Sequence, residues 1–192
     1  DRSMYPLSGD AVTVTIVEKC EDHSDIFIDI CCNGAGRDAF IIPAGGFAVP
    51  CNDDTKLETA GEDGNLRSQE QVYMNGALIY NFVAESIPEI VKKAFVETSD
   101  NNETIDYFLF HQPNKLILDY LRQQMELTEE KCPTGLQNVG NTAAASIPLL
   151  LTTLKERGFD FSQAKRVIAC GFGIGLSIGA TNLDLREVAF YP

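Results

Sequence analysis

Residues 105–114 read Ile-Asp-Tyr-Phe-Leu-Phe-His-Gln-Pro-Asn, an apolar run that polar side chains follow at once. Ile105–Phe110 has the length and composition of a short buried strand, and a helical pattern follows over Lys115–Glu126. In α/β folds, ligands meet side chains beyond the carboxyl ends of the strands. His111 stands at that point, where an imidazole can donate a hydrogen bond or move a proton near neutral pH. A structural histidine is the alternative interpretation.

A second polar stretch, residues 140–146, reads Gly-Asn-Thr-Ala-Ala-Ala-Ser and opens the helical pattern of Thr142–Arg157. Asn141 lies at the N-cap position, where its amide can cap the helix. The same amide can instead offer an N–H to a carbonyl oxygen. On these residues alone, capping and donation both stay open.

Elsewhere the pattern alternates strands with helices. Asn75–Thr98 places its apolar residues on one helical face, and Pro88 within it predicts a kink or a restart after Ser86. Cys51–Gln71 is polar and is expected to form a surface loop. The order strand, strand, loop, helix, strand, helix, helix, strand, strand predicts an α/β class and one domain over residues 1–192. The remaining strands are expected at Ala11–Lys19, Asp25–Cys32, Arg166–Cys170 and Leu176–Leu185.

Composition excludes several classes of function. The 192 residues carry 15 Lys and Arg against 28 Asp and Glu, a net charge of −13 that repels phosphate backbones and anionic membranes. No apolar run reaches the length of about 18 residues that spans a bilayer, and residues 1–6 lack the apolar stretch of a signal peptide. We therefore expect a cytoplasmic protein with no nucleic-acid or membrane partner. The first residue is Asp, which indicates a fragment or a processed chain.

The six cysteines and two histidines do not suggest a metal site. No CxxC pair occurs, so we predict no bound metal. Without an export signal, the cysteines are expected to be reduced thiols. Cys31 and Cys170 lie inside apolar strand-like runs and are expected to behave as small hydrophobic residues.

Two familiar motifs occur, but the sequence around each does not support its usual function. Gly34–Ala39 fits GxGxxA after a strand, but Pro43 follows where a dinucleotide-binding helix would continue, so only a turn is expected. Gly175–Gly179 fits GxSxG, yet a nucleophile elbow needs a helix after the serine and a histidine later in the chain. Both histidines precede Ser177, and a strand pattern follows it. Neither a dinucleotide site nor a serine hydrolase is expected.

Three stretches occur together: His111-Gln112-Pro113-Asn114, then Gly140–Pro148 with Asn141 thirty residues after His111, then Gly171–Gly175. Weaker marks are Gly9-Asp10-Ala11 and Met74-Asn75-Gly76. Over nearly the whole chain, this set resembles the C-terminal half of β-ketoacyl-acyl carrier protein synthase III, a condensing enzyme of the thiolase superfamily. The resemblance implies one thiolase-like layered unit of the βαβαβαββ type, with a mixed sheet flanked by helices. It also implies that the N-terminal half, which holds the catalytic cysteine in that family, is absent from this sequence.

The resemblance assigns roles to individual residues. The family condenses an acyl thioester with a malonyl thioester by decarboxylation, and His111 and Asn141 would stabilise the enolate oxygen that forms. The backbone N–H of Ile174, where the family usually has glycine, would face the thioester oxyanion. None of the six cysteines matches the nucleophile, and coenzyme A enters as a substrate thioester, so no resident cofactor is implied. Phe172 would lie near the cysteine of the other half, and the pantetheine channel would be lined by Asn114, Gly76 and Tyr80.

Partners follow from the same resemblance. The other half of the enzyme would cover an apolar face of this chain, and the full-length protein would be a homodimer. An acidic acyl carrier protein is a further partner; Lys115 and Arg122 are expected to replace an arginine that the family often has at Leu116. The chain is expected to be inactive alone, as a truncated piece or one subunit of a split enzyme. Two alternatives stay open, a specialised acyl-transfer or condensing enzyme of the superfamily and a non-catalytic partner subunit.

Overall fold

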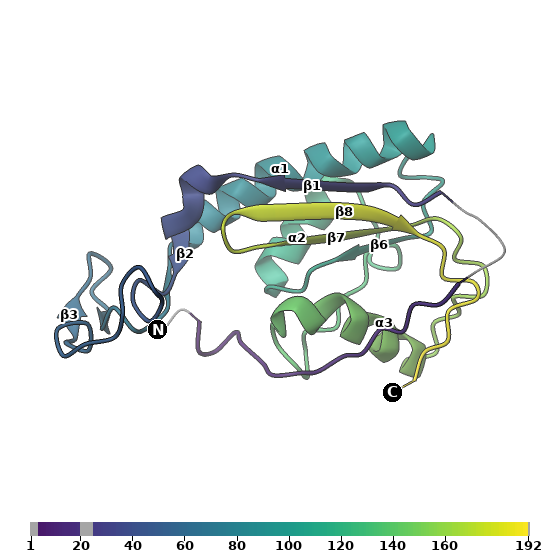
Figure 1. Ribbon diagram of the computed structural model, residues 1–192. Helices are drawn as coiled ribbons and strands as arrows, with labels where there is room; N and C mark the ends of the chain where they lie inside the picture. The colour runs from purple at the N-terminus through teal and green to yellow at the C-terminus, as the bar shows by residue number, and fades with distance from the viewer. Residues whose placement is uncertain (1–3, 20–24, 192) are drawn as a thin grey trace.

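A mixed four-stranded sheet lies at the centre of the computed structural model, which describes residues 4–19 and 25–191. Figure 1 shows α1 and α2 on one face of this sheet and α3 on the other. The strand order is β1-β8-β7-β6, in which β6 and β7 are parallel and β8 runs antiparallel to both of its neighbours. The elements are β1 (Ile28–Cys32), η1 (Gly34–Ala39), β2 (Phe40–Ile41), β3 (Thr59–Ala60), β4 (Leu66–Arg67), β5 (Tyr73–Met74), α1 (Gly76–Thr98), β6 (Tyr107–Phe110), α2 (Lys115–Gln124), η2 (Ala143–Ala145), α3 (Ser146–Glu156), β7 (Val167–Gly173) and β8 (Ser177–Leu183).

The pairing of β6 with β7 determines where the two strands end. Tyr107–Phe110 lies beside Val167–Cys170 in parallel register. On β6, Phe108 and Phe110 enter the core under α1 and α2, whereas Leu109 enters the core under α3. This alternation is why a short strand can be apolar throughout, because both of its faces are covered. Since the strands are parallel, their carboxyl ends meet at one edge of the sheet.

Helix α1 runs through Pro88 as one element, so the predicted restart after Ser86 is wrong. Residues on both sides of the proline are buried against the same core, including Val83, Ile87 and Val91. Burying one such side chain contributes about 1.5–3 kcal/mol, whereas a proline inside a helix costs about 3 kcal/mol. The packing of the whole stripe therefore outweighs the backbone hydrogen bond that proline cannot make.

Most of the other predicted elements are confirmed with shifted ends. The second predicted strand contains β1, the central one contains β6, and the two closing ones correspond to β7 and β8. The helix predicted from Thr142 begins only at Ser146, because the short helix η2 precedes it. Inside the predicted loop Cys51–Gln71, the two-residue strands β3 and β4 pair with each other, which the sequence pattern did not indicate.

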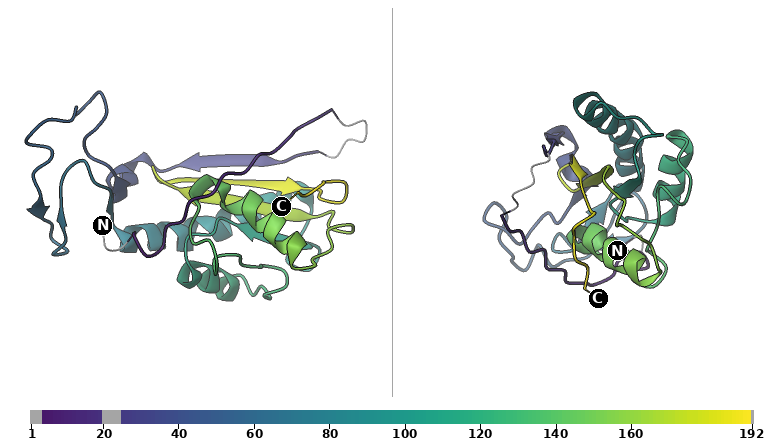
Figure 2. Two further views of the ribbon diagram at one scale, coloured as in Figure 1. Left: turned by 90° about the horizontal axis from the view of Figure 1, so that it is seen from below. Right: turned by 90° about the vertical axis from the view of Figure 1, so that its right-hand side faces the viewer.

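The strand predicted at Ala11–Lys19 does not form. Val12, Val14 and Ile16 are between 83% and 91% exposed, and Figure 2 shows the segment passing outside the sheet. A β-branched pattern favours a strand only where a neighbouring strand can pair with it. Within the described part of the chain, no strand offers that pairing.

One half of the α3 face of the sheet carries no helix. The core under α3 is built on β6 and β7. On β1, Ile28 and Ile30 lie opposite Thr181 and Gly179, which alternate with β8 residues that face α1. Ile28 and Ile30 are 65% and 71% exposed. The fold thus leaves an apolar strip along β1 uncovered on that face.

The two rejected motifs form no α-helix. Gly34–Ala39 is the short 3₁₀ helix η1, whose first turn is capped by the side chain of Asn33. Ser177 is the first residue of β8, so the GxSxG stretch leads into a strand. Both segments therefore lack the helix N-terminus on which their usual chemistry depends.

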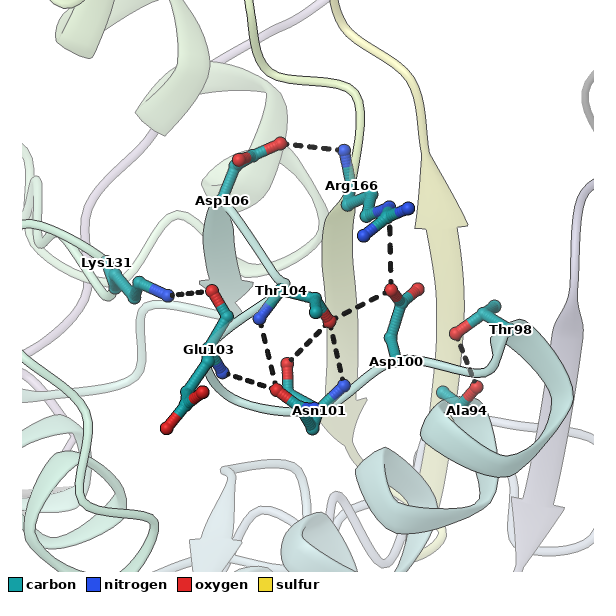
Figure 3. Close-up of polar contacts among 9 residues, drawn as sticks. All are labelled: Ala94, Thr98, Asp100, Asn101, Glu103, Thr104, Asp106, Lys131 and Arg166. Carbon is teal, nitrogen blue, oxygen red and sulfur yellow. Dashed lines mark hydrogen bonds and ion pairs between the residues drawn. The ribbon is translucent and has the colours of Figure 1, made fainter.

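At the opposite edge, the loop after α1 ties the amino ends of β6 and β7 together (Figure 3). Thr104 Oγ1 accepts the Asn101 N–H at 2.9 Å and contacts Asp100 Oδ1 at 3.0 Å. Across the two strands, the Arg166 N–H donates to Asp106 Oδ2 at 2.9 Å. Arg166 Nε also lies 3.5 Å from Asp100 Oδ1. These contacts hold the start of β6 against the start of β7.

Replacing Thr104 by valine keeps the side-chain shape and removes the hydroxyl that links Asp100 with Asn101. We expect the free energy of unfolding to fall by about 1–2 kcal/mol, because two polar groups lose a partner. Urea unfolding followed by circular dichroism measures the change. Thr59→Val, at an exposed threonine of β3, is the matched control; equal losses in the two variants would contradict a specific role for the Thr104 hydroxyl.

Candidate active site

His111 lies directly beyond the end of β6, as predicted. Its backbone N–H donates to Cys170 O at 2.9 Å and so continues the parallel pairing by one residue. Its ring Nδ1 lies 2.7 Å from Ser146 Oγ, and the edge of Phe172 meets the ring at 5.1 Å between centroids and 80° between planes. The imidazole is therefore held from two sides. No described residue bonds to Nε2.

The environment of His111 keeps its imidazole neutral. Burial lowers its pKa to about 4, because the charged form loses hydration that the surroundings do not replace. No described carboxylate contacts the ring to offset this loss. A neutral imidazole with one nitrogen already bonded can present its other nitrogen as a hydrogen-bond donor.

Asn141 precedes η2, and its side chain bonds to the first residue of that helix. Asn141 Oδ1 accepts the Ala143 N–H at 2.9 Å. The N-cap residues are Thr142 for η2 and Ala145 for α3, and neither helix is capped by a side chain, so the prediction that Asn141 is the N-cap is wrong. No described residue takes up the Nδ2 group. The bond to Ala143 uses only the amide oxygen and leaves the N–H groups available.

The segments that carry His111 and Asn141 adjoin each other. His111 bonds to Ser146 and Asn141 bonds to Ala143, so both side chains are anchored on one stretch of four residues. Neighbours of both also line one small cavity: Gln112 on the histidine side, and Gly140 and Thr142 on either side of Asn141. Two side chains from separate parts of the chain are thus anchored on one segment, Ala143–Ser146, near the end of β6 and the start of α3.

The turn between β7 and β8 lies at the same edge of the sheet. Phe172, near the end of β7, packs against the core and against the ring of His111. Ile174 follows in the turn; its side chain is 63% exposed, and its N–H makes no hydrogen bond within the described residues. Gly175 has a φ of +107°, a conformation that a residue with a side chain rarely adopts. The sharp turn leaves the Ile174 N–H open.

The three residues expected at the pantetheine channel lie at the first turns of α1 and α2. Gly76 begins α1, and a Cβ placed there would meet nothing within 4 Å. Tyr80, one turn further, packs against Tyr120 of α2 with ring centroids 5.0 Å apart and the planes tilted by 57°. Asn114 caps α2, because its Oδ1 accepts the Ile117 N–H at 2.9 Å. The ring contact links the first turns of α1 to the middle of α2, and the cap gives Asn114 a structural role.

The two cations of α2 do not form a free positive surface. Lys115 and Arg122 both form ion pairs with Asp119, and Arg122 Nη1 also lies 3.2 Å from Glu129 Oε1. The side chain of Arg122 is only 13% exposed. Hydrogen bonds from Lys115 and Arg122 lower the pKa of Asp119, which keeps it charged against them. The charge expected to replace an arginine at Leu116 is thus largely compensated within the helix.

The described cysteines are free thiols of two kinds. Cys132 and Cys170 are buried, and burial raises the pKa of each to about 12, so neither forms a thiolate at neutral pH. Cys31 is exposed on the edge strand β1, so its expected behaviour as a core residue is wrong, whereas that of Cys170 is confirmed. No group of three or more candidate ligands for a metal occurs in residues 4–19 and 25–191.

Two contacts of the candidate site were not predicted from the sequence. Nothing in the local pattern indicated a role for Ser146, yet its hydroxyl contacts His111 and accepts the Gln112 N–H at 3.4 Å. Gln112 is itself buried; its Nε2 donates to Phe110 O at 2.8 Å and its Oε1 accepts the Gly135 N–H at 3.0 Å. The spacing of 35 residues between His111 and Ser146 gave no signal, because only the packing of α3 against β6 brings them together.

Comparison with known proteins agrees with this geometry. Residues 95–185 match the family model for the C-terminal part of 3-oxoacyl-[acyl-carrier-protein (ACP)] synthase III. The beta-ketoacyl-[acyl-carrier-protein] synthase III of Clostridium perfringens is 32% identical to this chain over 190 residues, which are 96% of this chain and 54% of that protein. The chain is thus similar to the C-terminal half of synthase III, and we refer to it below as the synthase III-like domain.

Solved structures support the same relation for the synthase III-like domain. One structure of 3-oxoacyl-(acyl-carrier-protein) synthase III aligns with a TM-score of 0.81 and 29% identity, over 88% of this chain and 50% of that one. A 3-oxoacyl-(acyl-carrier protein) synthase from Burkholderia xenovorans LB400 gives 0.70 and 32%, over 84% and 45%. The predicted thiolase-like fold is confirmed. The domain spans about half the length of the relatives that it matches.

None of the helices in the described ranges is long and apolar enough to cross a bilayer. The longest, α1, carries five charged residues among its 23. Its apolar residues form one stripe that packs on the sheet.

We expect the imidazole of His111 to stay neutral down to about pH 4. Proton NMR titration of the two histidines, assigned with His111→Gln and His23→Gln, measures this directly. The unfolded chain has the ordinary pKa of about 6.5 and binds the proton more readily, so the free energy of unfolding should decrease as the pH falls from about 6.5 toward 4. A His111 signal that titrates near pH 6.5 would contradict the buried environment.

Proposed function

We propose that the synthase III-like domain supplies the decarboxylation half of a condensing active site. In this proposal an acyl thioester and a malonyl thioester are joined by decarboxylative Claisen condensation. His111 and Asn141 stabilise the negative oxygen that forms on the malonyl thioester. The cysteine that carries the acyl group belongs to the part of the relatives that this chain does not match.

The observation that carries the proposal is how the two side chains are anchored. Each has one end of its side chain bonded within the domain itself: His111 Nδ1 lies 2.7 Å from the Ser146 hydroxyl, and Asn141 Oδ1 accepts the Ala143 N–H. The other nitrogen of each side chain, Nε2 of His111 and Nδ2 of Asn141, is then available to donate a hydrogen bond. Two donors directed at one developing oxyanion are the arrangement that lowers such a barrier most effectively.

The proposal places the ring proton of His111 on Nε2. The Ser146 Oγ accepts the N–H of Gln112 at 3.4 Å and lies 2.7 Å from His111 Nδ1. The hydroxyl has one proton to donate, and in this proposal it donates that proton to Nδ1, which leaves the ring proton on Nε2. Since the low pKa keeps the ring neutral, the donor at Nε2 does not depend on protonation from solution.

The chemical step then balances as follows. The bond between the malonyl carboxylate and its α-carbon breaks, carbon dioxide leaves, and the electron pair passes to the enolate oxygen held by His111 and Asn141. The α-carbon next forms a bond to the acyl carbonyl carbon, whose oxyanion is held by the Ile174 N–H. The bond to the cysteine sulfur breaks last and returns a thiolate. Phe172 shields the imidazole from water during these steps.

The proposal extends to substrates and partners. The acyl donor is a coenzyme A thioester whose pantetheine arm lies along Gly76, Tyr80 and Asn114, and no resident cofactor takes part. The domain acts in the cytoplasm with its N-terminal half in a homodimer. An acyl carrier protein docks only weakly, because Asp119 neutralises the cations of α2. A specialised acyl transferase of the same superfamily is the second candidate, favoured by the isoleucine at position 174, which projects into solvent beside the site.

His111→Ala and Asn141→Ala are each expected to lower the rate of carbon dioxide release from a malonyl thioester by about 10²–10³-fold, the usual cost of one oxyanion donor. The measurement uses the assembled enzyme, meaning this chain together with the half that its relatives carry. Acyl transfer to the cysteine should persist in both variants, because that step does not form the enolate.

Asn138→Ala is the matched control, since Asn138 is an exposed asparagine in the same loop. If His111→Ala leaves decarboxylation unchanged, the decarboxylation proposal is wrong. If both variants release carbon dioxide normally but the product lacks a new carbon–carbon bond, the acyl-transferase candidate is favoured. The chain alone should show no condensation in any of these assays.

Two apolar segments that the described residues leave exposed support an interface with the other half of the enzyme. They are the strip formed by Ile28 and Ile30 on β1, and the extended segment with Val12, Val14 and Ile16. Contiguous exposed apolar surface of this kind is typical of an interface. We infer that the N-terminal half of the enzyme covers both, the first with a helix beside α3 and the second with a strand.

The isolated chain is expected to self-associate through these segments. Sedimentation velocity at low and high concentration should show growth in mass, and Val14→Asp combined with Ile16→Asp should reduce it. Replacing the exposed Leu78 of α1 by aspartate is the control, because it lies on neither segment. A clean monomer at all concentrations would contradict the proposed interface.

A further inference from the structure

A short segment near the start of the described chain is paired with the backbone of Asn141. Ser8 and Asn141 form an isolated parallel bridge. The Asn141 N–H donates to Leu7 O at 2.7 Å, and the Gly9 N–H donates to Asn141 O at 2.9 Å. Both backbone hydrogen-bonding groups of Asn141 are therefore taken by residues more than 130 positions away in the sequence.

Gly9 lies against the preceding loop with no space for a side chain. A Cβ at this position would stand 1.7 Å from Val139 O and 2.9 Å from the carbonyl carbon. Real Cβ atoms do not approach backbone so closely, so any other residue must push Val139 away. Gly140 faces the same segment from the other side, where a Cβ would stand 2.8 Å from Leu7 O. The two glycines allow the two backbones to touch.

The loop that this contact holds is conformationally strained. Gly140 has a φ of +66°, and Ala143 has a φ of +50° although it carries a side chain. The Oγ1 of Thr142 is buried and finds no hydrogen-bond partner among the described residues. Strain of this kind persists only where surrounding contacts enforce it. Asn141 lies between these residues, and the direction of its amide depends on their conformation.

We propose that Gly9 is a positioning residue for Asn141. Residues Leu7–Gly9 clamp the backbone of Asn141, and the clamp closes only because position 9 has no Cβ. With its backbone fixed on the clamp and its Oδ1 on the Ala143 N–H, the amide has one direction left for Nδ2. The inference rests on the proposed function, since it concerns how the second donor of the decarboxylation site is aimed.

A change in the clamp should affect the decarboxylation step and leave substrate binding unchanged. Gly9 touches no atom of the site other than the loop backbone, so its effect on catalysis must pass through Asn141. Displacing an oxyanion donor by about an ångström can lower a rate by about 10²-fold. Substrate binding along α1 and α2 does not involve this loop. A change at position 9 should therefore lower kcat for decarboxylation and leave KM for the malonyl thioester unchanged.

The test is a double-mutant cycle in the assembled enzyme. Gly9→Ala is measured alone and together with Asn141→Ala, with kcat and KM for carbon dioxide release as readouts. Gly46→Ala is the matched control, because a Cβ at Gly46 meets nothing within 4 Å. If Gly9→Ala proves insoluble, Gly140→Asn provides a milder clash at the same contact, since asparagine tolerates positive φ. Hydrogen exchange at the Asn141 amide reports on the clamp independently of catalysis.

We expect Gly9→Ala to lower kcat by about tenfold or more, to leave KM unchanged, and to add nothing further when Asn141 is already alanine. The Asn141 amide should also lose its protection from exchange in Gly9→Ala and keep it in Gly46→Ala. An equal loss of kcat in both backgrounds would overturn the positioning role while leaving the proposed function intact. If Asn141→Ala itself leaves decarboxylation unchanged, the proposed function fails, and the positioning role fails with it.

Discussion

The hydrogen bond between His111 Nδ1 and Ser146 Oγ joins the two parts of the chain from which the site is built. His111 ends a strand covered on both faces, and Ser146 begins the helix that covers one of them. The bond can form only when α3 has packed on β6, and it then holds the imidazole at the carboxyl edge of the sheet. Asn141 lies five residues before that helix and bonds to Ala143, so its position depends on the same packing.

Burial of the His111 imidazole determines its protonation state. The strand end and Phe172 remove water from the imidazole, and the resulting low pKa keeps the ring uncharged. In the proposed site, a neutral imidazole can donate to the enolate oxygen without first taking up a proton from solution. An imidazolium would also attract carboxylates of this chain, whose net charge is −13. The sharp turn at Gly175 adds a backbone donor at the same edge. The proposed donors thus belong to three separate segments, each placed near the carboxyl ends of β6 and β7.

Sequence patterns were sufficient for elements whose side chains alternate or repeat against a core within this chain. The β6 and β8 strands and the amphipathic α1 belong to this class, and so does the location of His111 and Asn141 at element boundaries. Sequence patterns gave wrong predictions for segments whose packing partners are not found within the described chain. Ala11–Lys19 has the composition of a strand but no neighbour in the described chain, and Cys31 lies on an uncovered edge. Ser146 and the Leu7–Gly9 contact depend on tertiary packing, which local spacing does not encode.

The central claim is that the imidazole and the amide act on one oxygen atom. A crystal structure of the assembled enzyme with a non-hydrolysable malonyl thioester analogue tests it most directly. The account predicts that the thioester carbonyl oxygen lies within about 3 Å of both His111 Nε2 and Asn141 Nδ2. A bound analogue whose thioester oxygen contacts neither group, with the two side chains directed to different cavities, would contradict it.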